Sequence, residues 1–318
     1  MLKCASFFAG VGGIDLGFEQ AGFETIFANE FDPYAADNFE SNFKIKVDRR
    51  DIRNIKETEL PDFDVLLAGF PCQAFSIAGH RQGFDDEKGR GNLFFELIRI
   101  MKHKRPRIAF FENVKNLASH DNGNTFKTIC EELKNIDYKY TFKIMNACEY
   151  GNIPQNRERI YIVAFRDHED FERFNFPASL PLTKTIRDII YFDSDCNPSY
   201  YYTKQNCYFY EQLKQTVISQ DTTYQWRRVY VRENKSNLIP TLTANMGTGG
   251  HNVPIILCDD GRFRKMTVRE CFNAQGFPDS FKLPNQCKGR LYKQAGNSVS
   301  VPVIHRIANQ IKIAMQEE

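Results

Sequence analysis

The 318-residue sequence lacks several features that mark particular protein classes. It has no apolar run near the roughly 18 residues that a membrane-spanning helix needs, and its first eight residues are interrupted too soon for a signal peptide. Its nine cysteines are odd in number and never spaced Cys-x-x-Cys, and its six histidines are dispersed. These absences argue against a disulfide framework and a zinc site, and they favour reduced thiols in the cytoplasm. The net charge of +2 neither requires nor excludes a polyanionic partner, because a local basic face matters more than the sum.

The most informative stretch of the sequence is Gly-Phe-Pro-Cys-Gln-Ala-Phe-Ser at residues 69–76, and the other motifs are interpreted in relation to it. It follows a short apolar run, residues 65–68, that is typical of a buried strand in a parallel sheet. Gly and Pro end that strand, so we expect Cys72 on a loop past its carboxyl end, where open α/β sheets place reactive groups. A buried structural cysteine is the ordinary alternative. Glu112 follows another predicted strand, residues 108–111, and offers a carboxylate partner that favours the reactive interpretation.

A glycine-rich turn at residues 10–13 follows the first predicted strand. Strand, glycines and helix are typical of a nucleotide cradle at a helix N-terminus, although a tight turn with no ligand is the alternative. Glu30 comes about 20 residues later, the spacing at which an acid meets ribose hydroxyls. Asp32 precedes a proline and is expected to cap the next helix. Asp51 falls where a third strand should end and offers an acceptor to an adenine amino group, although a solvated loop acid is the ordinary alternative.

The alternation of predicted strands and helices indicates an α/β fold, a doubly wound Rossmann-like sheet with a smaller, mostly β and loop domain. We expect residues 1–170 and 263–318 to form the larger, catalytic domain and residues 171–262 the smaller one. In the smaller one, residues 224–232 interleave aromatics with arginine, which suits nucleic acid, although a strand with a solvated basic face is the alternative. Residues 79–91 are rich in Gly and charge, and they are expected to form either a closing lid or an ordinary loop.

Taken together, the motifs resemble those of the DNA (cytosine-5)-methyltransferases of bacterial restriction-modification systems, over essentially the whole chain. One departure is an additional residue in Tyr150-Gly151-Asn152-Ile153-Pro154-Gln155, which leaves the geometry of that turn open. The stretches that match, in family order, are Phe8-Ala9-Gly10-Val11-Gly12-Gly13, Asn29-Glu30, Asp51-Ile52, Gly69-Phe70-Pro71-Cys72-Gln73, Glu112-Asn113-Val114, Gln155-Asn156-Arg157-Glu158-Arg159, Arg269-Glu270 with Gln275-Gly276-Phe277-Pro278, and Gly296-Asn297-Ser298-Val299.

The resemblance implies a DNA (cytosine-5-)-methyltransferase that moves a methyl group from S-adenosylmethionine to C5 of a flipped-out cytosine in a short specific sequence of double-stranded DNA. C5 is a poor nucleophile until a thiolate adds to C6, and Cys72 fits that role. Glu112 fits the group that stabilises charge at N3 and contacts the N4 amino group. By resemblance Arg159 contacts the base carbonyl and Arg157 supports the site. The base that removes the C5 proton is not identified by the sequence.

The resemblance implies the residues that hold S-adenosylmethionine, and together with the basic and aromatic residues of the smaller domain it indicates those that contact DNA. Those expected to hold S-adenosylmethionine are Phe8, Gly10, Val11, Gly13, Glu30, Phe31, Asp51, Ile52, Pro71, Leu93, Asn297 and Ser298. Those expected to contact DNA are Gln73, Ser76, Arg81, Gln155, Arg227, Arg228, Thr241 and Gly249. No metal is expected. The resemblance also implies a cytoplasmic monomer, paired in function with a restriction endonuclease whose cutting the methylation blocks.

Three other functions remain open at this point. A tRNA cytosine-5 methyltransferase would use the same scaffold, but the Cys-Phe-Thr typical of that branch is absent. A catalytically inert DNA-binding regulator is disfavoured by the intact Cys72, Glu112 and Arg159, although the sequence does not show activity. A nicotinamide-dependent oxidoreductase rests on the glycine-rich turn alone.

Overall fold

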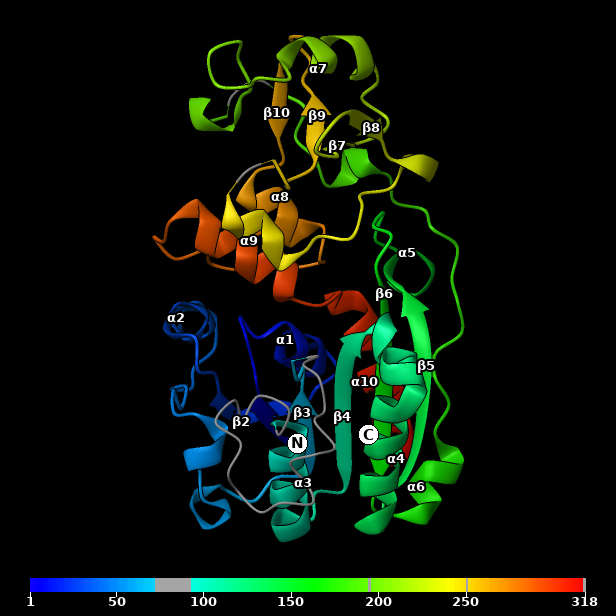
Figure 1. Ribbon diagram of the computed structural model, residues 1–318. Helices are drawn as coiled ribbons and strands as arrows, with labels where there is room; N and C mark the ends of the chain where they lie inside the picture. The colour runs from blue at the N-terminus through cyan, green and yellow to red at the C-terminus, as the bar shows by residue number, and fades with distance from the viewer. Residues whose placement is uncertain (72–92, 194–195, 250, 317–318) are drawn as a thin grey trace. The chain divides into compact units, whose positions relative to one another are not determined.

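The computed structural model describes residues 1–71, 93–193, 196–249 and 251–316 (Figure 1). Among the helices of these residues, none is both long enough and apolar enough to cross a membrane. The chain divides into two compact units, the first formed by Met1–Met145, Glu158–Pro177 and Ile304–Glu318, and the second by Asn146–Arg157 and Ala178–Val303.

The first unit is built on a six-stranded sheet with the strand order β2-β1-β3-β4-β6-β5. β1 is parallel to β2 and β3, and β3 is parallel to β4, whereas β6 is antiparallel to β4. All four residues of β3 are buried, as expected for a strand covered on both faces. The strands are β1 (Lys3–Phe7), β2 (Glu24–Asn29), β3 (Val65–Ala68), β4 (Ile108–Val114), β5 (Lys139–Asn146) and β6 (Glu158–Phe165).

Helices cover both faces of this sheet, which confirms the predicted doubly wound α/β fold. One core cluster joins alternate residues of β1, β3, β4 and β6 with the apolar faces of α3 and α4. On the opposite face, the ring of Phe18 in α1 lies 5.2 Å from that of Phe110 in β4. Gly17 of α1 leaves no room for a Cβ, because Ile304 of α10 would lie 2.6 Å away. The helices are α1 (Gly13–Gln20), α2 (Pro33–Asn42), α3 (Leu93–Lys104), α4 (Asn124–Asn135), α6 (His168–Arg173) and α10 (Val301–Ala314), which begins in the second unit.

The second unit contains a four-stranded sheet with the order β10-β9-β7-β8, in which all the pairs are antiparallel. Aromatic and aliphatic side chains from the sheet and α7 form its core. α9 packs directly on a 3-10 helix, η9 (Ala244–Thr248). The elements are β7 (Tyr224–Trp226), β8 (Val231–Glu233), β9 (Ile255–Leu257), β10 (Phe263–Lys265), α5 (Ala147–Tyr150), α7 (Tyr210–Thr216), α8 (Val268–Asn273) and α9 (Lys288–Asn297).

The boundaries of the two units differ from the predicted domains. Residues 263–303 were expected in the larger domain, but they belong to the second unit, because β10 pairs with β9 and α9 packs on η9. The first boundary falls after Pro177 instead of residue 170, since α6 packs on β6. The segment 146–157 is a further excursion into the second unit that the sequence did not indicate.

Candidate active site

Glu112 and Arg159 form the charged centre of the first unit. In the antiparallel pair of β4 and β6, Arg159 lies opposite Val114, so its side chain shares a face with Glu112 two residues away. The Nε of Arg159 lies 3.1 Å from Oε1 of Glu112, and the two side chains are only 12% and 10% exposed. Nη1 of Arg159 also donates to the carbonyl of Glu158, at 2.8 Å. The structure thus brings together two of the predicted catalytic residues, in a partly desolvated setting where electrostatic interactions are strengthened.

Gly69 and Phe70, which begin the stretch that contains Cys72, lie beside this ion pair. Gly69 follows β3, and a Cβ there would lie 3.7 Å from Oε2 of Glu112. Asn113 is buried and its Nδ2 donates to the carbonyl of Phe70 at 2.8 Å, so the ends of β3 and β4 are tied together. Cys72, and with it the predicted lid at residues 79–91 and the predicted DNA contacts Gln73, Ser76 and Arg81, lies outside the described residues.

Glu30 and the glycine-rich turn form a cradle at the same edge of the sheet. The backbone N–H groups of Gly10 and Asp32 donate to the two carboxylate oxygens of Glu30, each at 2.8 Å. Gly10 has φ +58° and open space where a Cβ would be, and Phe8 is also left-handed, with φ 54°. These two hydrogen bonds fix the orientation of the Glu30 carboxylate, and its contact with ribose hydroxyls stays a prediction.

The other predicted cofactor residues of this unit fall into two groups. Phe31 is 70% exposed and Pro71 is also exposed, so both offer apolar surface to a ligand. The remaining four are partly or fully buried in the turn and the nearby core, namely Val11, Gly13, Ile52 and Leu93.

The two acidic residues near the cradle take capping roles. Asp32 caps α2 by accepting from the N–H groups of Tyr34 and Ala35, with proline at the first helical position, as predicted. Asp51 caps a short 3-10 helix and forms a 2.6 Å ion pair with Arg53, which lowers the pKa of Asp51. The Asp51 side chain is 22% exposed, and its contact with an adenine amino group stays a prediction.

Gln155 and Arg157 are buried in the second unit. Gln155 is 0% exposed, and its Nε2 donates to the carbonyl of Ala274 at 2.6 Å. In this structure the Gln155 amide is enclosed and bonds inside the protein, and its contact with DNA stays a prediction. Arg157 is 2% exposed, and it donates to main-chain carbonyls, including that of Leu242 at 2.8 Å. This geometry supports a structural part in the site and not a direct contact with a base.

The remaining predicted residues of this unit lie on two neighbouring segments. Ser298 follows α9, and among the described residues no hydrogen-bond partner is found for its buried hydroxyl, an arrangement that fits a bound polar ligand. The adjoining Asn297 is exposed. Thr241 is half-buried and donates its hydroxyl to the carbonyl of Asn156 at 2.6 Å, whereas Gly249 is exposed with φ +84°.

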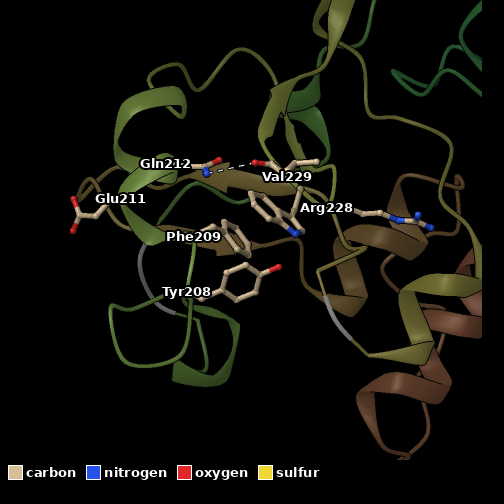
Figure 2. Close-up of a pocket in the computed structure, with 7 residues that line it drawn as sticks. Tyr208, Phe209, Glu211, Gln212, Arg228 and Val229 are labelled. Carbon is tan, nitrogen blue, oxygen red and sulfur yellow. Dashed lines mark hydrogen bonds between the residues drawn. The ribbon is translucent and has the colours of Figure 1, made fainter.

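The hairpin of β7 and β8 carries the aromatic and arginine residues singled out in the sequence. Its turn, residues 227–230, is closed by an N–H···O bond from Arg227 to Tyr230, and all four side chains are exposed. Arg228 and Val229 of this turn help to line a pocket of about 430 Å³ that the sequence did not indicate, together with Phe209 and Trp226, whose rings stack 4.0 Å apart. Figure 2 shows Arg228 extending away from the ring of Phe209, while Gln212 reaches the carbonyl of Val229.

No cluster of three or more His, Cys, Asp or Glu suited to a metal ion occurs within the described ranges. The eight cysteines in those ranges are free. Sequence reasoning missed Asn113 as an anchoring residue, although its place directly after Glu112 at the end of a strand was a signal for it.

Comparisons with known proteins identify the family of this chain. The family model for C-5 cytosine-specific DNA methylase matches residues 2–313. The type II methyltransferase M.Bsp6I of Bacillus sp. (strain RFL6) is 58% identical over 99% of this chain and 100% of its own length. M.HhaI of Haemophilus parahaemolyticus, also a type II methyltransferase, is 38% identical over 98% and 94%. The solved Dnmt2 methyltransferase of S. pombe has the same fold, with a TM-score of 0.76 at 19% identity and 99% coverage of both chains. The chain therefore belongs to the C-5 cytosine-specific DNA methylase family.

Proposed function

We propose that this chain transfers the methyl group of S-adenosylmethionine to C5 of a cytosine that is flipped out of a short specific sequence in double-stranded DNA. Methylation of DNA cytosine at C5 is the activity of the family. The observation that carries the assignment to these residues is the Glu112–Arg159 ion pair, 3.1 Å long, beside the backbone anchor that precedes Cys72. Reactive groups at the carboxyl ends of adjacent parallel strands are the arrangement that the chemistry needs.

In the proposed mechanism Cys72 supplies the nucleophile. Its thiolate adds to C6 of the cytosine, which places the displaced electron pair on the C5 side of the ring and charge at N3. In its protonated form Glu112 donates its O–H to N3 and accepts from the N4 amino group through the other oxygen, and Arg159 holds Glu112 in place while contacting the base carbonyl. C5 then takes the methyl group, loses its proton to a base, and the thiolate leaves from C6 with its electron pair. Each bond formed by Cys72 is thus broken again, and the enzyme is regenerated.

The residues present fit S-adenosylmethionine as the methyl donor. When bound, this cofactor supplies an electrophilic methyl group on sulfur. In the first unit, Gly10 leaves open space, Glu30 presents a fixed carboxylate to ribose hydroxyls, and the exposed ring of Phe31 offers a stacking surface to adenine. In the second unit, the buried hydroxyl of Ser298 is a candidate donor. Asp51, whose carboxylate is paired with Arg53, is a candidate acceptor for the adenine amino group.

Double-stranded DNA is the proposed partner, and the β7–β8 hairpin with residues 241–249 is its proposed reading surface. Arg227 and Arg228 are exposed, and arginine reads guanine edges and phosphates in the major groove. The biological role that follows is protection of a specific sequence from a restriction endonuclease, by a monomer acting in the cytoplasm, where thiols stay reduced.

The first experiment incubates the protein with S-adenosylmethionine and unmethylated genomic DNA and maps converted cytosines by bisulfite sequencing. We expect one short motif methylated at one cytosine. Cys72→Ser should abolish transfer while S-adenosylmethionine still binds, and Glu112→Gln should slow it by about 10²–10⁴-fold, the usual contribution of one acid–base group. Full activity in Cys72→Ser would refute the mechanism. Labelling of tRNA in preference to DNA in a parallel reaction would favour the RNA alternative.

A further inference from the structure

Arg157 joins two segments of the second unit that are far apart in the sequence. Its Nη1 donates to the carbonyl of Leu242 at 2.8 Å. Its Nη2 donates to the carbonyls of Gly296, at 3.3 Å, and Ser298. A planar guanidinium with donors in a fixed fork is suited to hold several carbonyls at defined angles, which a flexible lysine ammonium does not do.

The residues next to Arg157 add further hydrogen bonds to the first of these segments, at Thr241–Leu242. Gln155 accepts from the N–H of Leu242 at 3.4 Å, while Arg157 binds the carbonyl of the same residue. The backbones of Asn156 and Pro154 exchange hydrogen bonds with Ile239, at 2.9 and 2.8 Å. The Thr241–Leu242 segment is therefore fastened to residues 154–157 through both main chain and side chain.

The two segments that Arg157 joins are also in direct backbone contact. A Cβ on Gly296 would lie 2.1 Å from the carbonyl carbon of Thr243, and a Cβ on Gly247 would lie 2.3 Å from the carbonyl oxygen of Gly289. Because main-chain atoms meet main-chain atoms here, neither segment shifts without displacing the other.

Each segment also carries groups that point to a ligand. In the first, Thr243, Asn245 and Thr248 are exposed, and they belong to the proposed DNA-reading surface. In the second, Asn297 is exposed, and the buried Ser298 hydroxyl has no hydrogen-bond partner among the described residues.

We propose that Arg157 is a positioning residue that sets the Thr241–Leu242 segment and the Gly296–Ser298 turn against each other, so that one buried guanidinium supports the binding of both DNA and S-adenosylmethionine. This inference rests on the proposed function for the identity of the two ligands. It differs from a catalytic role, because a 2% exposed side chain engaged with main-chain carbonyls reaches substrate only through the segments that it holds.

The test compares Arg157→Lys with Arg264→Lys. Arg264 is the matched control, since it is also buried in this unit, but it pairs with Glu270 and binds the carbonyls of Tyr191 and Lys265. Both variants should melt below the wild type. Assayed at a temperature where both are folded, only Arg157→Lys should raise the KM for DNA and the KM for S-adenosylmethionine, each by about tenfold or more, as expected for a lost charge-assisted hydrogen bond.

Two further variants separate the effect on DNA binding from the effect on S-adenosylmethionine binding. Gln155→Met, which removes the bonds of this amide to Leu242 and Ala274 and leaves the Arg157 guanidinium in place, should raise the KM for DNA and leave that for S-adenosylmethionine within about twofold. Ser298→Ala should do the reverse. Calorimetric titration with S-adenosylmethionine in the absence of DNA measures cofactor affinity independently of activity. A wild-type protein that binds S-adenosylmethionine but is inactive on DNA would therefore count against the proposed function and not against the positioning role of Arg157.

Three outcomes would overturn the proposal. One is a lower kcat in Arg157→Lys with both KM values unchanged, which indicates a catalytic role. Another is an equal rise of both KM values in Arg264→Lys, which indicates general loosening of the unit. If Arg157→Lys does not fold, Gln155→Met decides, and an unchanged KM for DNA in that variant rejects the positioning role.

Discussion

Asp15 is a buried carboxyl in the first unit that the proposed mechanism does not use. It is 0% exposed in α1 and accepts hydrogen bonds from the hydroxyls of Ser6, at 3.0 Å, and Thr25, at 3.4 Å. Burial raises the pKa of Asp15 to about 7, and the two hydroxyl hydrogen bonds offset only part of this shift. The folded protein thus holds a proton that the unfolded chain has already released above about pH 4.

The stability of the protein should therefore fall as the pH rises from about 4 to about 7. The folded-state pKa lies above the unfolded one, so the stabilisation is complete below the unfolded pKa and is lost as the pH passes through the folded pKa. Asp15→Asn does not ionise, and it should remove this pH dependence, on the order of 2–4 kcal/mol. Urea denaturation at pH 5 and pH 8 measures it, with Asp62→Asn at an exposed carboxylate as control. Equal pH dependence in wild type and Asp15→Asn would contradict the assignment.

The residues of the candidate site were predictable where the chemistry restricts the residue type, and less so where packing decides. The position of Glu112 at the end of a strand indicates its role, and the pairing of β4 with β6 places Arg159 beside it. Gln155 and Arg157 lie only a few residues from Arg159, yet both are buried in the other unit. Nothing in the local pattern distinguishes a polar side chain that faces a ligand from one that binds main-chain carbonyls, because that depends on segments far along the chain.

Gly296 determines how closely α9 and η9 approach, at the scale of elements. Its replacement by alanine suits the helix but places a Cβ 2.1 Å from the carbonyl carbon of Thr243, and main-chain atoms cannot rotate away. We expect Gly296→Ala to destabilise the protein by about 1–3 kcal/mol, the usual cost of overpacking, and to weaken DNA binding. Gly289→Ala is the graded control, because its Cβ would meet Gly247 at 3.1 Å and should cost less. Thermal melts of the two variants rank them, and an equal or larger loss in Gly289→Ala would contradict this packing argument.

Elements with strong local signals were predictable from the sequence. The apolar run at residues 65–68 forms β3, and Thr267 begins α8 with a capping box to Glu270, as its composition indicates. Residues 240–243 form no strand and lead into η9, and the backbone of Ile239 just before them bonds to Pro154 and Asn156. The second unit combines residues 146–157 with residues 178–303, although residues 158–177 between them belong to the first unit. Contacts between segments so far apart in the sequence leave little trace in local periodicity.

At the scale of the whole molecule, a net charge of +2 gives little general attraction to DNA, so affinity should depend on local basic groups. Among the described residues, neither Arg227 nor Arg228 forms an ion pair, and both are exposed on the hairpin turn. Each phosphate contact contributes about 0.9 to the slope of log K against log salt concentration.

Replacing Arg227 and Arg228 by alanine should thus weaken DNA binding and reduce the magnitude of that slope by about 2 if both bind phosphates, or by about 1 if one reads a base instead. Arg262→Ala is the control, because Arg262 is an exposed arginine of the same unit that Asp260 engages at 2.5 Å, and it should leave the slope unchanged. Fluorescence anisotropy with a labelled duplex across a range of salt concentrations gives both quantities. A slope equal to that of the wild type in the double variant would remove the hairpin from the DNA interface and leave residues 241–249 as the reading surface.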